Sequence, residues 1–144
     1  MSVPSPRRVL LVDDDPSLIA ALTDGLTLVG GYDVTPASDG AAGLQRILDV
    51  RPDCVVVDIR MPRLNGYFLV RALRGDPQTA QIPIVILSAM VREREQLAGY
   101  LSGADAYLVK PVTMTDLLTA IDNAIGLTEE ERVQRLRMLA SDTN

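Results

Sequence analysis

Four short apolar runs in this chain each end at a polar residue that is able to take part in ionic or phosphoryl chemistry. The runs and the residues that end them are 9–12 with Asp13, 55–57 with Asp58, 84–87 with Ser88, and 106–109 with Lys110. Short apolar runs that alternate with helical periodicity are typical of βαβ units and predict a parallel sheet. Because ligands bind outside the carboxyl ends of the strands in open α/β sheets, we expect these four polar residues to meet at one edge.

The same pattern predicts an α/β fold of five strands and five helices. The expected strands cover residues 8–12, 32–37, 54–58, 84–87 and 106–109. The expected helices begin at Pro16, after Asp39, near Gly66 (to Arg74), near Met90 (to Leu101) and near Thr113. Pro36 interrupts the second strand, and proline in a strand indicates the edge of a sheet. Doubly wound five-stranded parallel sheets commonly have the strand order 2-1-3-4-5, as in flavodoxin-like folds, which makes the second strand an edge.

Helix ends and the apolar positions of three helices are also predicted, and the apolar residues of the last helix are expected to be buried. Asp15 is suited to cap the first helix, where Pro16 is a favoured first residue and Gly30-Gly31 a stop signal. The second helix is expected to be capped by Asp39. The expected apolar positions are Leu18, Leu22 and Leu26 in the first helix, Leu44, Ile47 and Leu48 in the second, and Leu117, Leu118, Ile121 and Ile125 in the last.

Composition and charge exclude several classes of function. The net charge is −5 with 14 basic residues in no long run, which disfavours direct binding of nucleic acid by this segment. The absence of histidine excludes histidine-based zinc sites and catalytic triads. The single cysteine, Cys54, cannot form a disulfide within the chain, which suits a reducing compartment. No signal peptide or 18-residue apolar run is present, so we expect a soluble, cytoplasmic protein without a membrane span.

The 144 residues are expected to form one domain with two short extensions. We expect a flexible N-terminus over residues 1–6, a domain over 7–127, and a helical C-terminal extension or linker over 128–144. In the last segment, Thr128 to Glu131 form a capping-box pattern, followed by a thin apolar stripe of Val133, Leu136 and Ala140 with Leu139 alongside. The segment is open to three interpretations: a frayed extension, a linker helix toward an output module, or a contact in a homodimer.

The polar residues at the strand ends suit a phosphoryl group. Clustered carboxylates repel one another unless a cation neutralises them, and Mg²⁺ binds through one or two carboxylates together with phosphate oxygens. A lysine offers a point charge to phosphate, and a serine hydroxyl can donate to a phosphoryl oxygen. No glycine-rich nucleotide-binding loop is present. Carboxylates can form aspartyl-phosphates, which makes Asp58, alone at the end of an apolar strand, the candidate acceptor.

These motifs resemble the receiver domain of two-component response regulators. The resemblance covers about residues 7–127. The matching segments are residues 10–16, 57–62 with Asn65-Gly66, 82–89 and 103–111.

The resemblance implies a role for each site residue. Asp58 is expected to accept a phosphoryl group from a phosphohistidine of a sensor histidine kinase or a histidine phosphotransfer protein. Mg²⁺ is expected to bind Asp14, Asp58 and the backbone carbonyl of Arg60 directly, and Asp13 through water. Lys110 is expected to contact the phosphoryl oxygens, Ser88 to shift toward them, and Tyr107 to swing into the space that Ser88 leaves.

The implied function is a phosphorylation-activated signalling switch. The protein is then not an enzyme with an external substrate but a phosphoacceptor that assists its own phosphorylation and dephosphorylation. Phosphorylation is expected to change the face formed by the fourth helix, fifth strand and fifth helix, and so to control an effector or output domain. Two alternatives stay open: a Mg²⁺-dependent phosphatase with an aspartyl-phosphate intermediate, and a scaffold that binds partners without phosphorylation. Such phosphatases usually carry a second aspartate where this chain has Arg60.

Overall fold

Five parallel strands form one sheet in the order β2-β1-β3-β4-β5 in the computed structural model. The model describes residues 5–59, 66–89, 98–99, 101, 103–127 and 129–142. The strands are β1 (Arg8–Val12), β2 (Asp33–Ala37), β3 (Cys54–Asp58), β4 (Ile84–Ser88) and β5 (Ala106–Val109). The helices are α1 (Pro16–Leu28), α2 (Gly40–Val50), α3 (Gly66–Gly75), α5 (Met114–Gly126) and α6 (Glu129–Asp142).

The strand order confirms the doubly wound, flavodoxin-like fold that the sequence predicts. β2 lies at one edge, and Pro36 is tolerated there because an edge strand leaves one row of backbone groups without a neighbouring strand. β3 and β4 are buried over their whole length, as expected for central strands covered on both faces.

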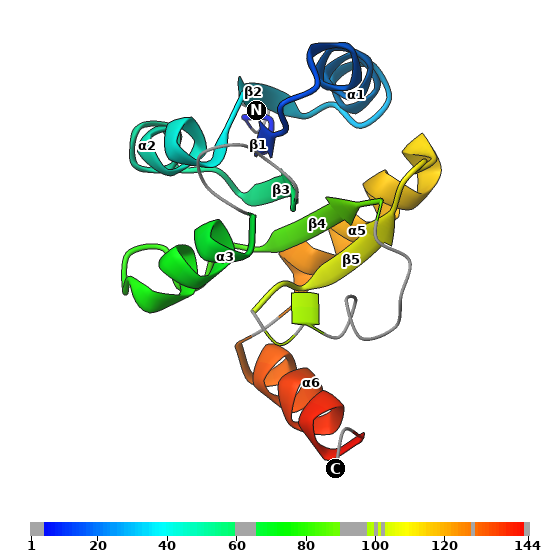
Figure 1. The fold of residues 1–144 in the computed structure, drawn as a ribbon. Coiled ribbons are helices and arrows are strands. Elements are labelled where there is room, and N and C mark those ends of the chain that lie inside the picture. The colour runs from blue at the N-terminus through cyan, green and yellow to red at the C-terminus, as the bar shows by residue number, and fades with distance from the viewer. Residues whose placement is uncertain are drawn as a thin grey trace.

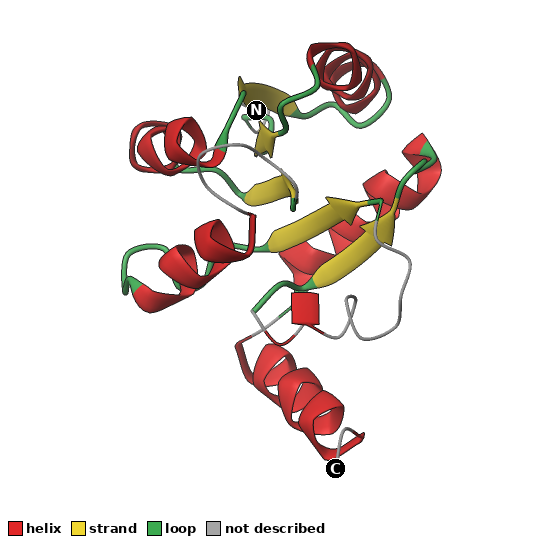
Figure 2. Ribbon diagram, in the orientation of Figure 1, coloured by secondary structure: helices red, strands yellow, loops and turns green. Residues whose placement is uncertain are grey.

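Helices cover both faces of the sheet (Figures 1 and 2). α2 and α3 lie on one side, and α1 and α5 lie on the other. Each side encloses its own aliphatic core. Leu10, Val57 and Ile86 belong to the core beneath α2 and α3, whereas Leu11 and Val56 belong to the core beneath α1 and α5. Successive residues of a strand therefore pack into opposite cores, which fixes which side chains face which helices.

The predicted helix starts are confirmed by their caps. Asp15 accepts hydrogen bonds from the backbone N–H groups of Ser17 and Leu18 at α1, and Asp39 accepts one from Ala42 at α2. Thr113 accepts one from Asp116 at α5. These side chains satisfy N–H groups that have no partner inside the helix.

The predicted apolar faces of α2 and α5 are only partly buried. Of the three apolar residues of α2, Ile47 is buried, whereas Leu44 and Leu48 are 40% and 58% exposed. α2 presents a narrower face to the sheet than its apolar pattern suggests. In α5, Leu117 and Ile121 are buried, whereas Leu118 and Ile125 are half-buried at the margin of the same core.

Two predicted segments fall partly outside the described residues. Of the fourth helix, expected over residues 90–101, only Ala98, Gly99 and Leu101 are described, and these are helical.

The C-terminal segment forms the helix α6, which extends away from the sheet (Figure 1). Its Val133 is 41% exposed and its Met138 is 69% exposed. Thr128 and the side chains of Leu136, Leu139 and Ala140 lie outside the description.

Candidate functional site

The register of the strands brings the four predicted polar residues together at the carboxyl ends of the strands, called the carboxyl edge of the sheet below. Val12 of β1 pairs with Val57 of β3, so Asp13 and Asp58 follow at the same level. Asp58 pairs with Leu87 of β4, and Ser88 pairs with Val109 of β5. The backbone N–H of Lys110 donates to the carbonyl of Ser88 at 2.8 Å, which continues the ladder by one residue and holds Lys110 at this edge.

Three carboxylates converge at this edge. Carboxylate oxygens of Asp13, Asp14 and Asp58 all lie within 4.8 Å of one another. Asp13 and Asp58 are only 1% and 7% exposed, whereas Asp14 is exposed. One oxygen of Asp13, Oδ1, accepts a hydrogen bond from the backbone N–H of Asp15 at 3.0 Å, which fixes that carboxylate at the start of α1. The cluster combines two buried carboxylates with one open to solvent.

Lys110 supplies the positive charge that faces this cluster. Its Nζ lies 3.0 Å from Asp13 Oδ2 and 3.5 Å from Asp58 Oδ1. Burial alone would lower the pKa of the Lys110 ammonium, but the hydrogen bond to Asp13 and the charges of Asp58 and Asp13 outweigh it, so the pKa lies above its ordinary value. Among the residues that the structure describes, one ammonium at a cluster of three carboxylates leaves negative charge in excess, which favours binding of a further cation.

Ser88 and Tyr107 lie on the same side of the sheet. Ile86 pairs with Tyr107, and both belong to the core beneath α2 and α3. Because side chains two residues apart on a strand share a face, Ser88 projects to the side that Tyr107 occupies. Ser88 is fully buried and Tyr107 is 6% exposed, so the tyrosine ring lies inward in this structure.

Gly66 closes the segment after Asp58 tightly against the strand. Its backbone N–H donates to the carbonyl of Ile59 at 3.0 Å. A Cβ atom at residue 66 would lie 2.5 Å from the carbonyl oxygen of Asp58 and 2.8 Å from Cα of Ile59. Both of these are backbone atoms, which cannot move aside as a flexible side chain does, so glycine is required here. Arg60 to Asn65, including the predicted carbonyl ligand of Arg60, lie outside the described residues.

An ion pair that the sequence did not indicate lies at the amino ends of β4 and β5, called the amino edge of the sheet below. Arg74 Nη2 lies 3.0 Å from Asp105 Oδ2, and this Asp105 side chain is fully buried. Arg74 also donates to the carbonyls of Gly103, Ala80 and Ile82. The signal that was available is an aspartate directly before an apolar strand, a position that usually indicates a turn.

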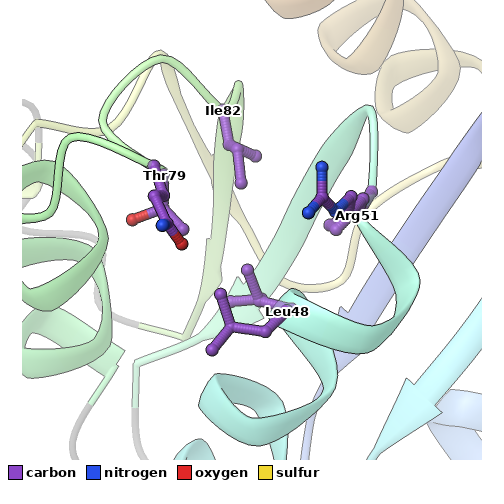
Figure 3. A pocket seen from close by; sticks show the side chains of 7 residues that line it. Leu48, Arg51, Thr79 and Ile82 are labelled. Carbon is purple, nitrogen blue, oxygen red and sulfur yellow. The ribbon is translucent and has the colours of Figure 1, made fainter.

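A cavity of about 380 Å³ lies away from the carboxylate cluster, between the end of α2 and the segment before β4 (Figure 3). Leu48, Arg51, Thr79 and Ile82 surround it. The hydroxyl of Thr79 already donates to the carbonyl of Leu73 at 2.6 Å. Arg51 and Gln78 also line this cavity, but the cluster of three carboxylates with Lys110 lies at the strand ends instead.

A comparison with known protein families identifies one family that matches most of the chain. The family described as response regulator receiver domain matches residues 9–122. The chain belongs to this family. Membership makes it a regulatory domain of two-component signalling and a phosphorylation-activated switch.

Curated relatives and solved structures agree with this assignment. The receiver domain is 43% identical over 117 residues to the transcriptional regulatory protein PrrA of Mycobacterium leprae, covering 81% of this chain and 49% of that protein. It is 34% identical over 122 residues to the DNA-binding dual master transcriptional regulator RpaA of Synechocystis, covering 85% of this chain and 50% of RpaA. The chain thus spans about half the length of these curated relatives.

Two solved structures are matched over nearly their whole length. A putative response regulator of Chloroflexus aurantiacus superposes with a TM-score of 0.81 at 32% identity, covering 85% of this chain and 100% of that one. The chemotaxis protein CheY4 of Vibrio cholerae superposes with a TM-score of 0.78 at 30% identity, covering 83% and 99%. Among the described residues of the receiver domain, no helix is long and apolar enough to cross a membrane.

Proposed function

We propose that Asp58 is the phosphoacceptor of this receiver domain and that Asp13, Asp14 and Asp58 hold the Mg²⁺ on which the reaction depends. The observation that carries the proposal is the convergence of these three carboxylates within 4.8 Å, with Lys110 facing two of them. Asp58 ends a fully buried strand, which fixes its position relative to an incoming group.

The donor set fits Mg²⁺. Hard carboxylate oxygens are the ligands that this ion takes from proteins, and it usually binds through one or two of them while keeping several waters. The exposed Asp14 leaves room for those waters, and the charge excess at the edge favours a divalent cation. When bound, Mg²⁺ would neutralise charge on the phosphoryl oxygens. The predicted carbonyl ligand of Arg60 stays part of this proposal.

The chain's own residues account for the transfer step. An oxygen of the Asp58 carboxylate attacks the phosphorus atom, an O–P bond forms, and the bond from phosphorus to the imidazole nitrogen of the donor breaks. Phosphoryl transfer needs positioning and charge stabilisation more than covalent chemistry from the protein. Lys110 supplies positive charge 3.5 Å from Asp58 and is held there by the backbone hydrogen bond to Ser88. The same residues would position water when the domain assists its own dephosphorylation.

Ser88 and Tyr107 are proposed to report phosphorylation to the surface. The buried Ser88 hydroxyl lies beyond Asp58 on the next strand and can donate to a phosphoryl oxygen. Tyr107 projects to the same side of the sheet, so a shift of Ser88 changes the space open to the ring. A phosphoryl group that favours one arrangement of these side chains shifts the population of the domain toward it.

The partners and the division of the chain also remain proposals. We propose a receiver domain over residues 7–127, an N-terminal extension over 1–6, and a linker or dimer contact over 128–144. The phosphoryl donor is a sensor histidine kinase or histidine phosphotransfer protein, and the switch acts on an effector or output domain. The matched PrrA and RpaA are named as transcriptional regulators and are about twice as long as the matched segment, which supports an output partner. The cytoplasmic location stays a prediction.

Labelling with acetyl phosphate tests the proposal. We expect wild-type protein to take up label only with Mg²⁺, and Asp58→Asn to abolish the label. Asp49→Asn, at an exposed position of α2, is the matched control and should label like wild type. Label that persists in Asp58→Asn would exclude Asp58 as acceptor. Turnover of an external phosphomonoester would favour the phosphatase, and a wild type that binds no Mg²⁺ and takes no label would favour the scaffold.

A further inference from the structure

The ring of Tyr107 rests directly on a glycine of the neighbouring helical segment. A Cβ atom on Gly99 would lie 2.5 Å from Cδ2 and 2.9 Å from Cε2 of the ring, and 3.4 Å from Cδ1 of Ile86. Real Cβ atoms essentially never approach other heavy atoms as closely as the two ring distances. The ring therefore occupies space that a side chain at residue 99 would otherwise fill.

The backbone around Gly99 is tied to the start of β5. The carbonyl of Gly99 accepts a hydrogen bond from the N–H of Ala104 at 3.4 Å, and Ala104 is buried in the same core as Tyr107. The N–H of Asp105 then donates to the carbonyl of Ile84 at 2.8 Å. These two hydrogen bonds tie the backbone of Gly99 to the start of β5, and the start of β5 to β4, so the backbone of Gly99 resists displacement. The tyrosine ring turns about two side-chain torsions, so it is the group that would move.

We propose that Gly99 is a positioning residue for Tyr107: its missing side chain lets the ring lie inward and so sets how strongly phosphorylation at Asp58 is coupled to the tyrosine. The inference rests on the proposed function, in which Ser88 and Tyr107 respond to the phosphoryl group. A side chain at residue 99 disfavours the inward ring. By thermodynamic linkage, a side chain at residue 99 must then raise by the same amount the free energy of any phosphoryl-bound state that needs the ring inward.

The test uses the full chain and Gly99→Ala. Gly126→Ala is the matched control, because a Cβ there meets nothing within 4 Å and the residue also lies in a helix. The ring is followed by fluorine NMR of protein carrying fluorotyrosine, with the Tyr107 signal assigned from Tyr107→Phe. Beryllofluoride with Mg²⁺ serves as the phosphoryl probe.

We expect Gly99→Ala to move the Tyr107 signal toward that of a solvent-exposed tyrosine, even without the probe. The affinity for beryllofluoride should fall about tenfold, a typical size for coupling between sites, while the affinity for Mg²⁺ alone changes by less than about twofold. The control, Gly126→Ala, should match wild type in the Tyr107 signal, the affinity for beryllofluoride and the affinity for Mg²⁺. Gly99→Ala that matches the control in ring signal and beryllofluoride affinity would overturn the inference.

A double variant separates the ring from general packing. In a Tyr107→Ala background, Gly99→Ala should cause no further loss of beryllofluoride affinity, because the residue with which it interferes is gone. If Gly99→Ala alone does not fold, the double variant should fold, and its failure would overturn the inference. Failure of wild-type protein to bind beryllofluoride would instead contradict the proposed role of Asp58, and the ring signal without the probe would still test Gly99.

Discussion

An ion pair lies at the amino edge of the sheet and another at its carboxyl edge, and the two pairs differ in the charge that the described residues place around them. At the amino edge, Arg74 divides its N–H groups among three backbone carbonyls and Asp105, and Asp105 also accepts from the N–H of Ile84. At the carboxyl edge, Lys110 faces two buried carboxylates, and a third lies close by. The Arg74–Asp105 pair holds segments of the chain together, whereas the carboxylates around Lys110 leave negative charge that a bound cation can neutralise.

A structural charge and a functional charge can be distinguished in this fold by comparing the two ion pairs. Both pairs have the same 3.0 Å separation, and in each the acidic side chain is almost inaccessible. Distance and burial therefore do not separate them. What separates them is the balance of charge: among the described residues, Arg74 is paired with one carboxylate at the amino edge, whereas Lys110 lies at a cluster of three carboxylates at the carboxyl edge.

The largest effect on stability is expected at the amino edge. Arg74→Ala leaves the buried carboxylate of Asp105 without its cation and should lower the free energy of unfolding by about 3 kcal/mol, because an uncompensated buried charge is costly. Urea denaturation measures the loss, and Mg²⁺ should not restore it. Arg71→Ala, at an exposed position of the same helix, should change stability by less than about 0.5 kcal/mol. An Arg74→Ala protein as stable as Arg71→Ala would remove the contrast between the edges.

Mg²⁺ should stabilise the protein through the carboxyl edge alone. At a concentration one hundred times its dissociation constant, a ligand that binds only the folded state adds about 2.7 kcal/mol to the free energy of unfolding. We expect thermal denaturation to show this gain in wild type and in Arg71→Ala, and to show little of it in Asp13→Asn. An equal gain in Asp13→Asn would place the ion elsewhere.

A smaller, pH-dependent effect is expected at Lys110. Without Mg²⁺, Lys110→Met should lower the free energy of unfolding by about 2 kcal/mol, the size of a hydrogen bond to a charged group. The folded protein raises the pKa of Lys110 above its ordinary value of 10.5, so the contribution is fully present below that pH. It is lost as the pH rises through the raised pKa. Urea denaturation of both proteins should give a constant difference from pH 7 to 9 that shrinks above pH 10.5. A difference that grows with pH would contradict the cause given for the shift.

The parts of the fold that follow from local pattern could be predicted from the sequence. The strands end where the apolar runs end, and Asp15 and Asp39 cap their helices, because these features depend on neighbouring residues. The carboxyl edge could be predicted as well, since parallel strands bring Asp13 and Asp58 together whatever the details of the helices.

The remaining features depend on contacts between distant segments. Arg74 and Asp105 are 31 residues apart, and nothing in the spacing links them. The exposure of Leu44 and Leu48 depends on how α2 is rotated on the sheet, which an apolar pattern does not fix. The contact of Gly99 with Tyr107 depends on how closely a helical segment approaches the sheet. Local sequence pattern does not specify any of these three arrangements, and Asp105 before its strand indicates only a turn.

Site mapping of the phosphoryl group is the sharpest test of whether Asp58 is the Mg²⁺-dependent phosphoacceptor. Wild-type protein is incubated with acetyl phosphate and Mg²⁺, digested at acid pH, and the modified residue is located by tandem mass spectrometry. We expect one phosphoryl group, on Asp58, that is absent when Mg²⁺ is removed by a chelator. A phosphoryl group on Asp13, Asp14 or any residue other than Asp58, or on Asp58 without Mg²⁺, would contradict it.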